Sequence, residues 1–208
     1  MRNSKIKPSS TGVRGEPLRQ RVIDAAERLL RDGKADFSMR DLAAEAGVSF
    51  ATPFNQFGSK AAIMQTLSTR RIDTMEIRFA AAPPVTDTTA RVMLAIDTAA
   101  AVMLEEPAIN RGVMGWLGTA SPSPGQVWAR STALWTLALS TGDGLIAARR
   151  DQALRCLPGQ LAFAFRGVLS FWTAGELPDA ALAPNARDLA ETLLLGFTGE
   201  RPSRASRP

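Results

Sequence analysis

Residues 38–60, SMRDLAAEAGVSFATPFNQFGSK, contain two short segments with the marks of helices, joined at a glycine. Ser38 and Asp41 stand three residues apart, close to the pattern of a capping box, and predict a helix that begins there and breaks at Gly47. Gly47 can adopt the positive φ of a tight turn, and Ser49 can cap a second segment over 49–57. Two short helices that meet at a glycine-containing turn are typical of a helix–turn–helix.

The second segment predicts a helix face that can contact bases. Phe54 and Phe57 fall on its inner side, where burial of each ring contributes roughly 1.5–3 kcal/mol to stability. The residues left pointing outward or along the helix edge are Phe50, Ala51, Thr52, Asn55 and Gln56. Asn and Gln side chains pair bidentately with adenine, and Thr and Phe pack on the methyl group of thymine. Arg40 and Lys60, at the starts of their helices, would then lie near phosphates.

The flanking segments favour this motif over a plain helical hairpin with a polar face, which is the alternative. From Leu18 to Leu30, apolar residues recur on one face, so a long amphipathic helix precedes the motif and stops near Gly33. A longer helix follows over 60–79, and the Pro-Pro pair within 81–85 breaks the chain. Further helices are expected near 86–105, 107–118, 124–141, 145–155, 158–176 and 185–198. Since no stretch alternates with a period of two, the predicted class is all-α.

Residues 16–80, about a third of the chain, resemble the DNA-binding domain of the TetR family of transcriptional regulators. The resemblance rests on Arg-Asp-Leu-Ala at 40–43, Ala-Gly-Val-Ser at 46–49, Phe54-x-x-Phe57 and Gly-Ser-Lys at 58–60. It implies an N-terminal three-helix helix–turn–helix domain over 16–60, which helix 60–79 links to a C-terminal helical effector-binding and dimerisation domain over 81–198. The DNA-binding candidates are then Arg40, Ser49, Phe50, Ala51, Thr52, Phe54, Asn55, Gln56 and Lys60.

Two residues depart from the family's pattern. Most members carry Tyr where Phe54 stands, and the tyrosine hydroxyl commonly contacts a phosphate, so this chain lacks one backbone contact. Pro53 has no backbone N–H, which delays the effective start of the second helix. Both departures affect the expected operator preference. They also keep open the alternative of a helical adaptor that retains the head without binding DNA.

The resemblance further implies an effector cavity and a two-fold dimer. It places around the cavity Met93, Ile96, Met103, Met114, Trp116, Trp128 and Trp135. Arg166, on an otherwise apolar helix, would either meet an anionic effector or lie at a surface or interface. In the family the last two long helices form a four-helix bundle with a second subunit. The candidates for that contact are Leu161, Phe165, Val168, Trp172, Leu189, Leu193 and Phe197, although the same faces fit a core within one chain.

Composition excludes several classes of function. The 208 residues include no His, no Tyr and a single Cys, Cys156. Histidine-based triads, histidine metal sites and intrachain disulfides are therefore excluded. The only adjacent acids beside an apolar segment, Glu105 and Glu106, point about 100° apart on a helix and fit a helix end better than an acid–base pair. We expect neither enzyme activity nor a cofactor.

The positive charge lies at the two ends of the chain. Residues 1–60 hold 11 Lys and Arg against 7 Asp and Glu, residues 61–198 hold 11 against 12, and residues 199–208 hold 3 against 1. This distribution favours a polyanion-binding head on a neutral body. We expect residues 1–15 to form a flexible basic arm, which either reaches DNA or stays solvated, and residues 199–208 to form a disordered tail.

No apolar run reaches the roughly 18 residues that span a bilayer, and no signal peptide is visible. The expectation is a cytoplasmic protein without a membrane partner. Taken together, the sequence predicts a homodimeric, ligand-responsive regulator that binds double-stranded DNA at a palindromic operator. By resemblance it is a repressor, released by a small apolar effector.

Overall fold

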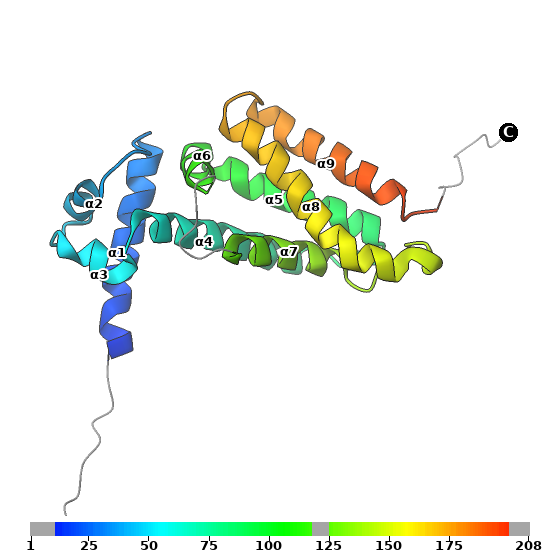
Figure 1. Cartoon of the computed structure of the whole chain (residues 1–208), viewed down its shortest axis with the longest axis horizontal. Coiled ribbons are helices and arrows are strands. Elements are labelled where there is room, and N and C mark those ends of the chain that lie inside the picture. Colours follow the sequence, from blue (N-terminus) through cyan, green and yellow to red (C-terminus); the bar gives the residue numbers. More distant parts are fainter. Residues whose placement is uncertain (1–10, 118–124, 200–208) are drawn as a thin grey trace, which may run out of the picture.

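The computed structural model describes residues 11–117 and 125–199, with side chains from Pro17 onward. In this part of the chain all secondary-structure elements are helices, as the sequence predicts. The first three helices form a head (residues 11–58), made of α1 (Thr11–Arg31), α2 (Met39–Ala46) and α3 (Ala51–Phe57). From the head, α4 (Lys60–Ala81) runs into a larger helical body (Figure 1).

The body (residues 60–199) is a bundle in which α8 packs against both α7 and α9. Its further elements are α5 (Thr88–Glu105), α6 (Pro107–Trp116), α7 (Gln126–Leu139), the 3-10 helix η1 (Ala147–Arg149), α8 (Arg150–Thr173) and α9 (Asp179–Leu195). In Figure 1, α6 lies at the end of the body nearest the head, and α8 and α9 lie on the side away from α4. None of the helices in the described ranges is long and apolar enough to cross a membrane.

The core of the body is built around two tryptophans that are almost completely buried, Trp135 of α7 and Trp172 of α8. The ring of Trp135 meets Phe165 edge to face, with 5.5 Å between the ring centres. The indole Nε1 of Trp172 donates to Asp179 Oδ1 at 2.8 Å, and Arg111 of α6 pairs with the same carboxylate at 2.7 Å. Since a buried indole N–H needs a partner, this contact fixes the corner between α8 and α9 and ties α6 to it.

A second core fills the head and continues into the body. It joins α1, α2 and the start of α4, and it includes Ile109 and Val113 of α6. Gly112 permits the close approach of α6 to α1, because a Cβ at this position would lie 2.7 Å from Leu30 Cδ2, well inside van der Waals contact. The head and α6 therefore share one apolar core.

The first helix is longer than the sequence analysis expected. It begins at Thr11 and contains Pro17, whereas the periodic pattern starts only at Leu18. The expected flexible arm over 1–15 is therefore wrong for residues 11–15, which belong to α1. Residues 1–10 and 200–208, on which the rest of the arm and nearly all of the tail fall, lie outside the described residues.

Two prolines near the expected starts of helices 158–176 and 185–198 lie inside helices. α8 runs through Pro158 as one helix, where two helices over 145–155 and 158–176 were expected. A proline in a helix removes one backbone hydrogen bond, but Leu157 and Leu161 on either side are almost fully buried, and their packing holds the helix together. α9 likewise begins at Asp179 and takes Pro184 into its first two turns, six residues before the expected start.

Candidate DNA-binding surface and effector pocket

The turn between α2 and α3 has the geometry that the sequence predicts. The Ser38 hydroxyl accepts from the backbone N–H of Asp41 at 3.2 Å, and the Asp41 carboxylate accepts from the backbone N–H of Ser38 at 2.8 Å, which completes a capping box. The hydrogen bonds that the backbone N–H and the hydroxyl of Ser38 donate to the carboxylate hold the pKa of Asp41 below its ordinary value. At the other end, Gly47 adopts a φ of 62° and closes α2. The two short helices thus meet at a left-handed glycine, as in a helix–turn–helix.

Two arginines of α1 donate hydrogen bonds to backbone carbonyls of this motif. Arg21 donates to the carbonyl oxygens of Ala46 at 3.0 Å and Gly47 at 3.2 Å, at the end of α2. Arg19 donates to the carbonyl oxygen of Gln56 at 2.7 Å, and its guanidinium lies 4.1 Å from the centre of the Phe57 ring. Carbonyls at helix ends lack partners within the helix, and a cation also interacts favourably with the helix dipole there. The sequence analysis missed both arginines, because their targets are backbone atoms of other segments.

The buried side of α3 differs from the prediction. Pro53 is buried and Phe57 is half-buried, whereas Phe54, which was expected inside, is 42% exposed. α3 begins at Ala51, two residues later than expected, and its inner face follows an i, i+4 step from Pro53 to Phe57. The proline ring thus takes the place expected for the Phe54 ring, which is turned outward.

The outward ring of Phe54 forms a small aromatic cluster on the open side of α3. It meets Phe50 edge to face with 5.4 Å between the ring centres, and Phe50 is 53% exposed. The guanidinium of Arg40, an exposed side chain of α2, lies 5.7 Å from the centre of the Phe50 ring. Two exposed rings beside a cation form a surface that can contact both the apolar edge of a base and a phosphate.

The other candidates on α3 are exposed or half-exposed. Ala51 and Asn55 are exposed, and Thr52 and Gln56 are half-exposed. The expected capping role of Ser49 is not found, since Phe50 occupies the N-cap and no side chain caps α3. The Ser49 hydroxyl instead lies 2.8 Å from that of Thr52, and the two form a hydrogen bond at the start of the helix.

Lys60 has an internal role in place of the phosphate contact expected for it. Its Nζ donates to the carbonyl oxygens of Ala35 at 2.8 Å and Phe37 at 2.7 Å. The ammonium also lies 4.2 Å from the centre of the Phe37 ring and 4.7 Å from that of Trp116. Burial lowers the pKa of this amine, and the carboxylates of Asp36 and Asp41 partly oppose that effect. Lys60 thus fastens the loop between α1 and α2 to α4.

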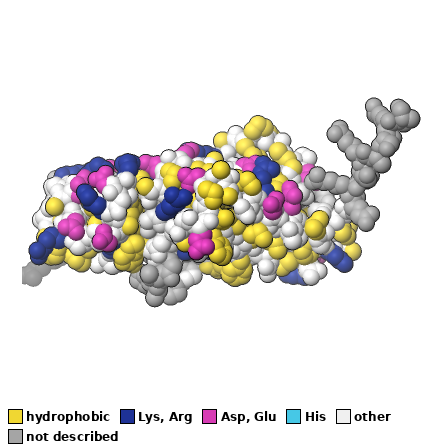
Figure 2. Space-filling view, turned by 90° about the horizontal axis from the view of Figure 1, so that it is seen from above, with side chains coloured by type: hydrophobic (Ala, Val, Ile, Leu, Met, Phe, Trp, Pro, Cys, Tyr) yellow, Lys and Arg dark blue, Asp and Glu magenta, His cyan; other side chains and the backbone are white. Residues whose placement is uncertain are grey.

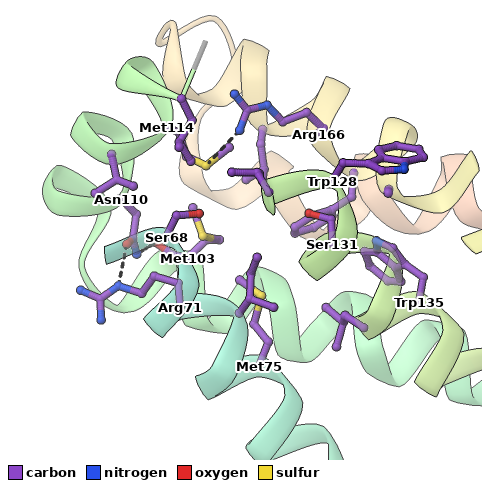
Figure 3. A pocket seen from close by; sticks show the side chains of 18 of the residues that line it. Ser68, Arg71, Met75, Met103, Asn110, Met114, Trp128, Ser131, Trp135 and Arg166 are labelled. Atoms are coloured by element: carbon purple, nitrogen blue, oxygen red, sulfur yellow. Dashed lines mark hydrogen bonds between the residues drawn. The ribbon is translucent and has the colours of Figure 1, made fainter. Parts of the chain in front are cut away.

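The body contains a cavity of about 270 Å³ between α4, α6, α7 and α8 (Figure 3). Of the seven residues expected around an effector, Met103, Met114, Trp128 and Trp135 line it. Met93 and Ile96 do not, because Ile96 is buried in the core of the body and Met93 packs against that core. Trp116 packs against the head, and its Nε1 donates to the carbonyl oxygen of Ala35 at 3.3 Å. The expectation was therefore wrong for these three residues.

The cavity also has polar lining residues that the sequence analysis did not select. Ser68 and Arg71 come from α4 and Asn110 from α6, and they lie near one another (Figure 3). Arg71 also bonds to Glu27 of the head. Arg166 reaches in from α8, on the far side from them. The sequence analysis singled out only Arg166, because a cation on an apolar helix is conspicuous, whereas Arg71 and Asn110 have ordinary polar surroundings in the sequence.

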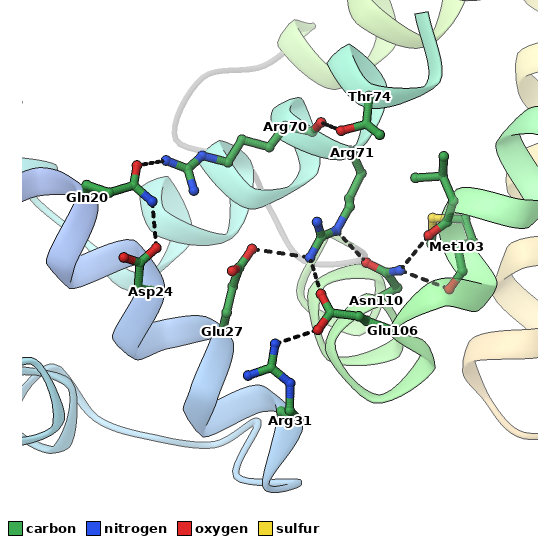
Figure 4. A network of polar contacts seen from close by, with 11 residues as sticks. Gln20, Asp24, Glu27, Arg31, Arg70, Arg71, Thr74, Met103, Glu106 and Asn110 are labelled. Atoms are coloured by element: carbon green, nitrogen blue, oxygen red, sulfur yellow. Dashed lines mark hydrogen bonds and ion pairs between the residues drawn. The ribbon is translucent and has the colours of Figure 1, made fainter. Parts of the chain in front are cut away.

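Arg71 connects the wall of this cavity to the head (Figure 4). Its Nε donates to Asn110 Oδ1 at 2.9 Å, and its Nη2 lies 3.2 Å from carboxylate oxygens of both Glu27 in α1 and Glu106 before α6. The amide of Asn110 donates in turn to the carbonyl oxygens of Val102 and Met103, at 3.2 and 2.9 Å. Arg31 of α1 also pairs with Glu106. One guanidinium thus joins α1, α4 and α6.

Most residues expected at the dimer contact lie inside one chain instead. Leu161, Phe165, Val168 and Trp172 are buried in the core of the body, so the expectation was wrong for them. Leu193 and Phe197 are partly buried against the same core, and only Leu189 is largely exposed. The exposed large apolar side chains of α8 are Phe163 and Phe171. Figure 2 shows hydrophobic side chains gathered over the body, whereas charged side chains of both signs crowd the head.

Comparisons with known proteins agree with this geometry. Residues 22–67 match the family model described as bacterial regulatory proteins, tetR family. A TetR transcriptional regulator from Rhodococcus sp. RHA1 has a similar fold, with a TM-score of 0.69 and 21% identity over 88% of this chain and 98% of that one. A TetR-family regulator from Mesorhizobium loti MAFF303099 gives a TM-score of 0.58 and 17% identity over 90% and 100%. A third, TetR-like regulator from Rhodococcus sp. RHA1 gives 0.55 and 18% over 92% and 100%.

No curated protein matches the chain significantly in sequence. The fold is shared with solved structures over 88–92% of the chain, and the family model covers the part that carries the turn between α2 and α3. Residues 22–67 are thus similar to the tetR family of bacterial regulatory proteins, and the chain shares its fold with solved structures described as TetR regulators.

Proposed function

We propose that this protein is a sequence-specific DNA-binding regulator that responds to a small molecule, and that it acts as a repressor. The observation that carries the proposal is the open face of α3, which presents Phe50, Ala51, Phe54 and Asn55 to solvent. Arg19 bonds to the end of α3, and Arg21 bonds to the end of α2. A short helix that is fixed from behind and polar and aromatic in front fits the major groove. The cavity beside Arg71 supports the response to a ligand.

Two copies of the head are needed to read a palindromic operator, so the proposal includes a two-fold dimer. The exposed side chains Phe163 and Phe171 of α8 and Leu189 of α9 support a contact through these two helices. Gly167 is also exposed between the two phenylalanines, and no atom lies within 4 Å of the place where its Cβ would be. A neighbouring helix can therefore approach α8 closely there.

Release from DNA would follow a shift between two arrangements of the heads. An effector in the cavity touches the wall formed by Arg71 and Asn110, whose other contacts reach Glu27 of the head. A ligand that changes the position of Arg71 therefore changes the contact between α4 and α1. If the effector prefers an arrangement in which the recognition helices no longer match the operator spacing, it lowers the affinity for DNA.

The test of DNA binding uses fluorescence anisotropy with a duplex from upstream of the protein's own gene and a scrambled duplex of equal length. We expect preference for the upstream duplex and a steep fall in affinity with salt, because binding releases counterions from phosphates. Asn55→Ala should reduce the preference by about 1–3 kcal/mol, the contribution of one bidentate base contact. Equal binding of both duplexes at every salt concentration would show the protein to be no operator-specific regulator and favour the adaptor alternative.

A matched pair of variants distinguishes a residue proposed to contact DNA from one that stabilises the fold of the head. Arg40→Met and Lys60→Met each remove one positive charge, but Arg40 is exposed whereas Lys60 bonds to two carbonyls. Arg40→Met should weaken binding to every DNA sequence and leave the thermal midpoint unchanged. Lys60→Met should lower the free energy of unfolding by about 1–3 kcal/mol, because the Phe37 carbonyl loses its donor and the Ala35 carbonyl keeps only the indole of Trp116. Thermal unfolding and anisotropy measure both effects, and a stable Lys60→Met protein would contradict the internal role of this lysine.

A further inference from the structure

Arg166 lines the cavity, and its positive charge is not paired with a carboxylate of the described residues. It lies half-buried on α8, and its Nη1 donates to Met114 Sδ at 3.5 Å. A thioether is a weak acceptor and carries no negative charge. Among the described residues no carboxylate pairs with Arg166, and the segment 118–124, between the lining residues Leu117 and Val127, contains no Asp or Glu in its sequence.

The other arginine of the cavity wall is already neutralised. Arg71 pairs with the carboxylates of Glu27 and Glu106, and its remaining contact is the amide of Asn110. No acidic side chain of the described chain lines the cavity itself. Of the two arginines that line the cavity, Arg166 is therefore the one whose charge is not neutralised by a carboxylate.

Burial makes this uncompensated charge costly. Loss of solvent lowers the pKa of the Arg166 guanidinium below its ordinary value, yet an arginine side chain stays protonated in proteins. A buried charge is usually paired, and an anion that enters beside it gains a bidentate, charge-assisted contact. The planar fork of a guanidinium matches a carboxylate in particular.

The other lining residues favour a ligand whose remaining part, apart from the anionic group, is apolar. Four aromatic side chains line the cavity, namely Trp128, Trp135, Phe163 and Phe165. Trp128 and Phe163 stack with 4.6 Å between their ring centres, and both are exposed, so they form the rim through which the cavity meets solvent. Met75, Met103 and Met114 also line the cavity, and flexible methionine side chains can adapt to the shape of a ligand.

We propose that the cavity binds an organic monocarboxylate with an aromatic or otherwise apolar body, whose carboxylate pairs with Arg166 while its body lies between the aromatic side chains. The inference rests on the proposed function, since it names the class of effector for the regulator. It also refines the expectation of a purely apolar effector, because one negative charge is now part of the ligand.

The experiment titrates the full-length protein, without DNA, with 4-phenylbutyrate, the neutral 4-phenylbutanamide and the cationic 4-phenylbutylamine. Trp128 and Trp135 line the cavity, so excitation at a wavelength that tryptophan alone absorbs reports occupancy. We expect the carboxylate to bind at least tenfold more tightly than the amide and the amine to bind most weakly. Equal affinity of the carboxylate and the amide, or no binding of any of the three, would overturn the proposal.

Arg166→Met should abolish the preference for the carboxylate while the amide still binds, and Arg166→Lys should keep part of it. Arg155→Met is the matched control, because Arg155 is an exposed arginine of the same helix outside the cavity. Circular dichroism verifies that each variant is folded. A preference that survives Arg166→Met would contradict the assignment of the anion site.

The failure of this inference is distinguishable from failure of the proposed function. Operator binding by the wild-type protein, measured separately by anisotropy, tests the regulator without any ligand. If the protein prefers the carboxylate but does not bind operator DNA, the anion site is supported and the regulatory function is contradicted. If the protein binds its operator but shows no preference for the carboxylate, the regulatory function is supported and the proposed effector class is contradicted.

Discussion

Phe171→Glu is expected to convert the protein into monomers and to lower its affinity for operator DNA by at least about 100-fold. Phe171 is 55% exposed on α8, it does not line the cavity, and the proposed dimer would bury its ring. A carboxylate buried in an apolar contact without a partner costs several kcal/mol, and every 1.4 kcal/mol is a factor of ten in an equilibrium. A monomer presents one recognition helix, so it loses the second half of a palindromic site.

Sedimentation velocity and anisotropy with the upstream duplex measure these two effects together. Ile77→Glu is the matched control, because Ile77 is an even more exposed apolar side chain but lies on α4. It should leave the assembly and the DNA affinity unchanged. If Phe171→Glu remains dimeric and binds DNA normally, the dimer does not use this face of α8.

Arg71→Met is expected to lower the free energy of unfolding by about 2 kcal/mol or more and to weaken the connection between the head and the body. Methionine keeps the length of the side chain but leaves Glu27, Glu106 and the amide of Asn110 without their shared donor. Breaking a buried ion pair from one side costs roughly 3–5 kcal/mol, and the partial exposure of both carboxylates reduces this figure.

Arg70→Met provides the comparison on the same helix. Arg70 bonds to the side chain of Gln20 in α1, a neutral partner that also bonds to Asp24, so its loss should cost less than 1 kcal/mol. Urea unfolding followed by circular dichroism measures both variants. A double-mutant cycle of Arg71→Met with Glu27→Gln should give a coupling energy of about 1 kcal/mol or more. Additive effects would show that Arg71 does not connect the cavity wall to the head through Glu27.

The head was largely predictable because its signals are local. The capping box of Ser38 and Asp41 and the glycine at position 47 act within a few residues, and the structure places both as the sequence predicts. The phase of α3 was not predictable from the same pattern, since a phenylalanine is the obvious residue to bury. The ring of Pro53 is buried instead, which turns Phe54 outward.

The cavity and the exposed apolar side chains of α8 were predicted less well, for a different reason. Apolar residues on adjacent faces of α8 carry the same signal, so periodicity could not separate Phe165, which packs inward, from Phe163 and Phe171, which face out. The polar wall depends on residues that are distant along the chain. Glu27, Arg71 and Glu106 come from three segments, and no spacing rule within a segment brings them together.

The carbonyl oxygen of Ala35 accepts both from Lys60 of α4 and from the indole of Trp116 of α6, so the body holds the loop of the head through a main-chain atom. A main-chain atom cannot be deleted by replacing a side chain. Substitutions that weaken this contact between head and body are therefore expected at Lys60 and Trp116. At residue 35 itself, replacement by another small side chain should leave both hydrogen bonds in place.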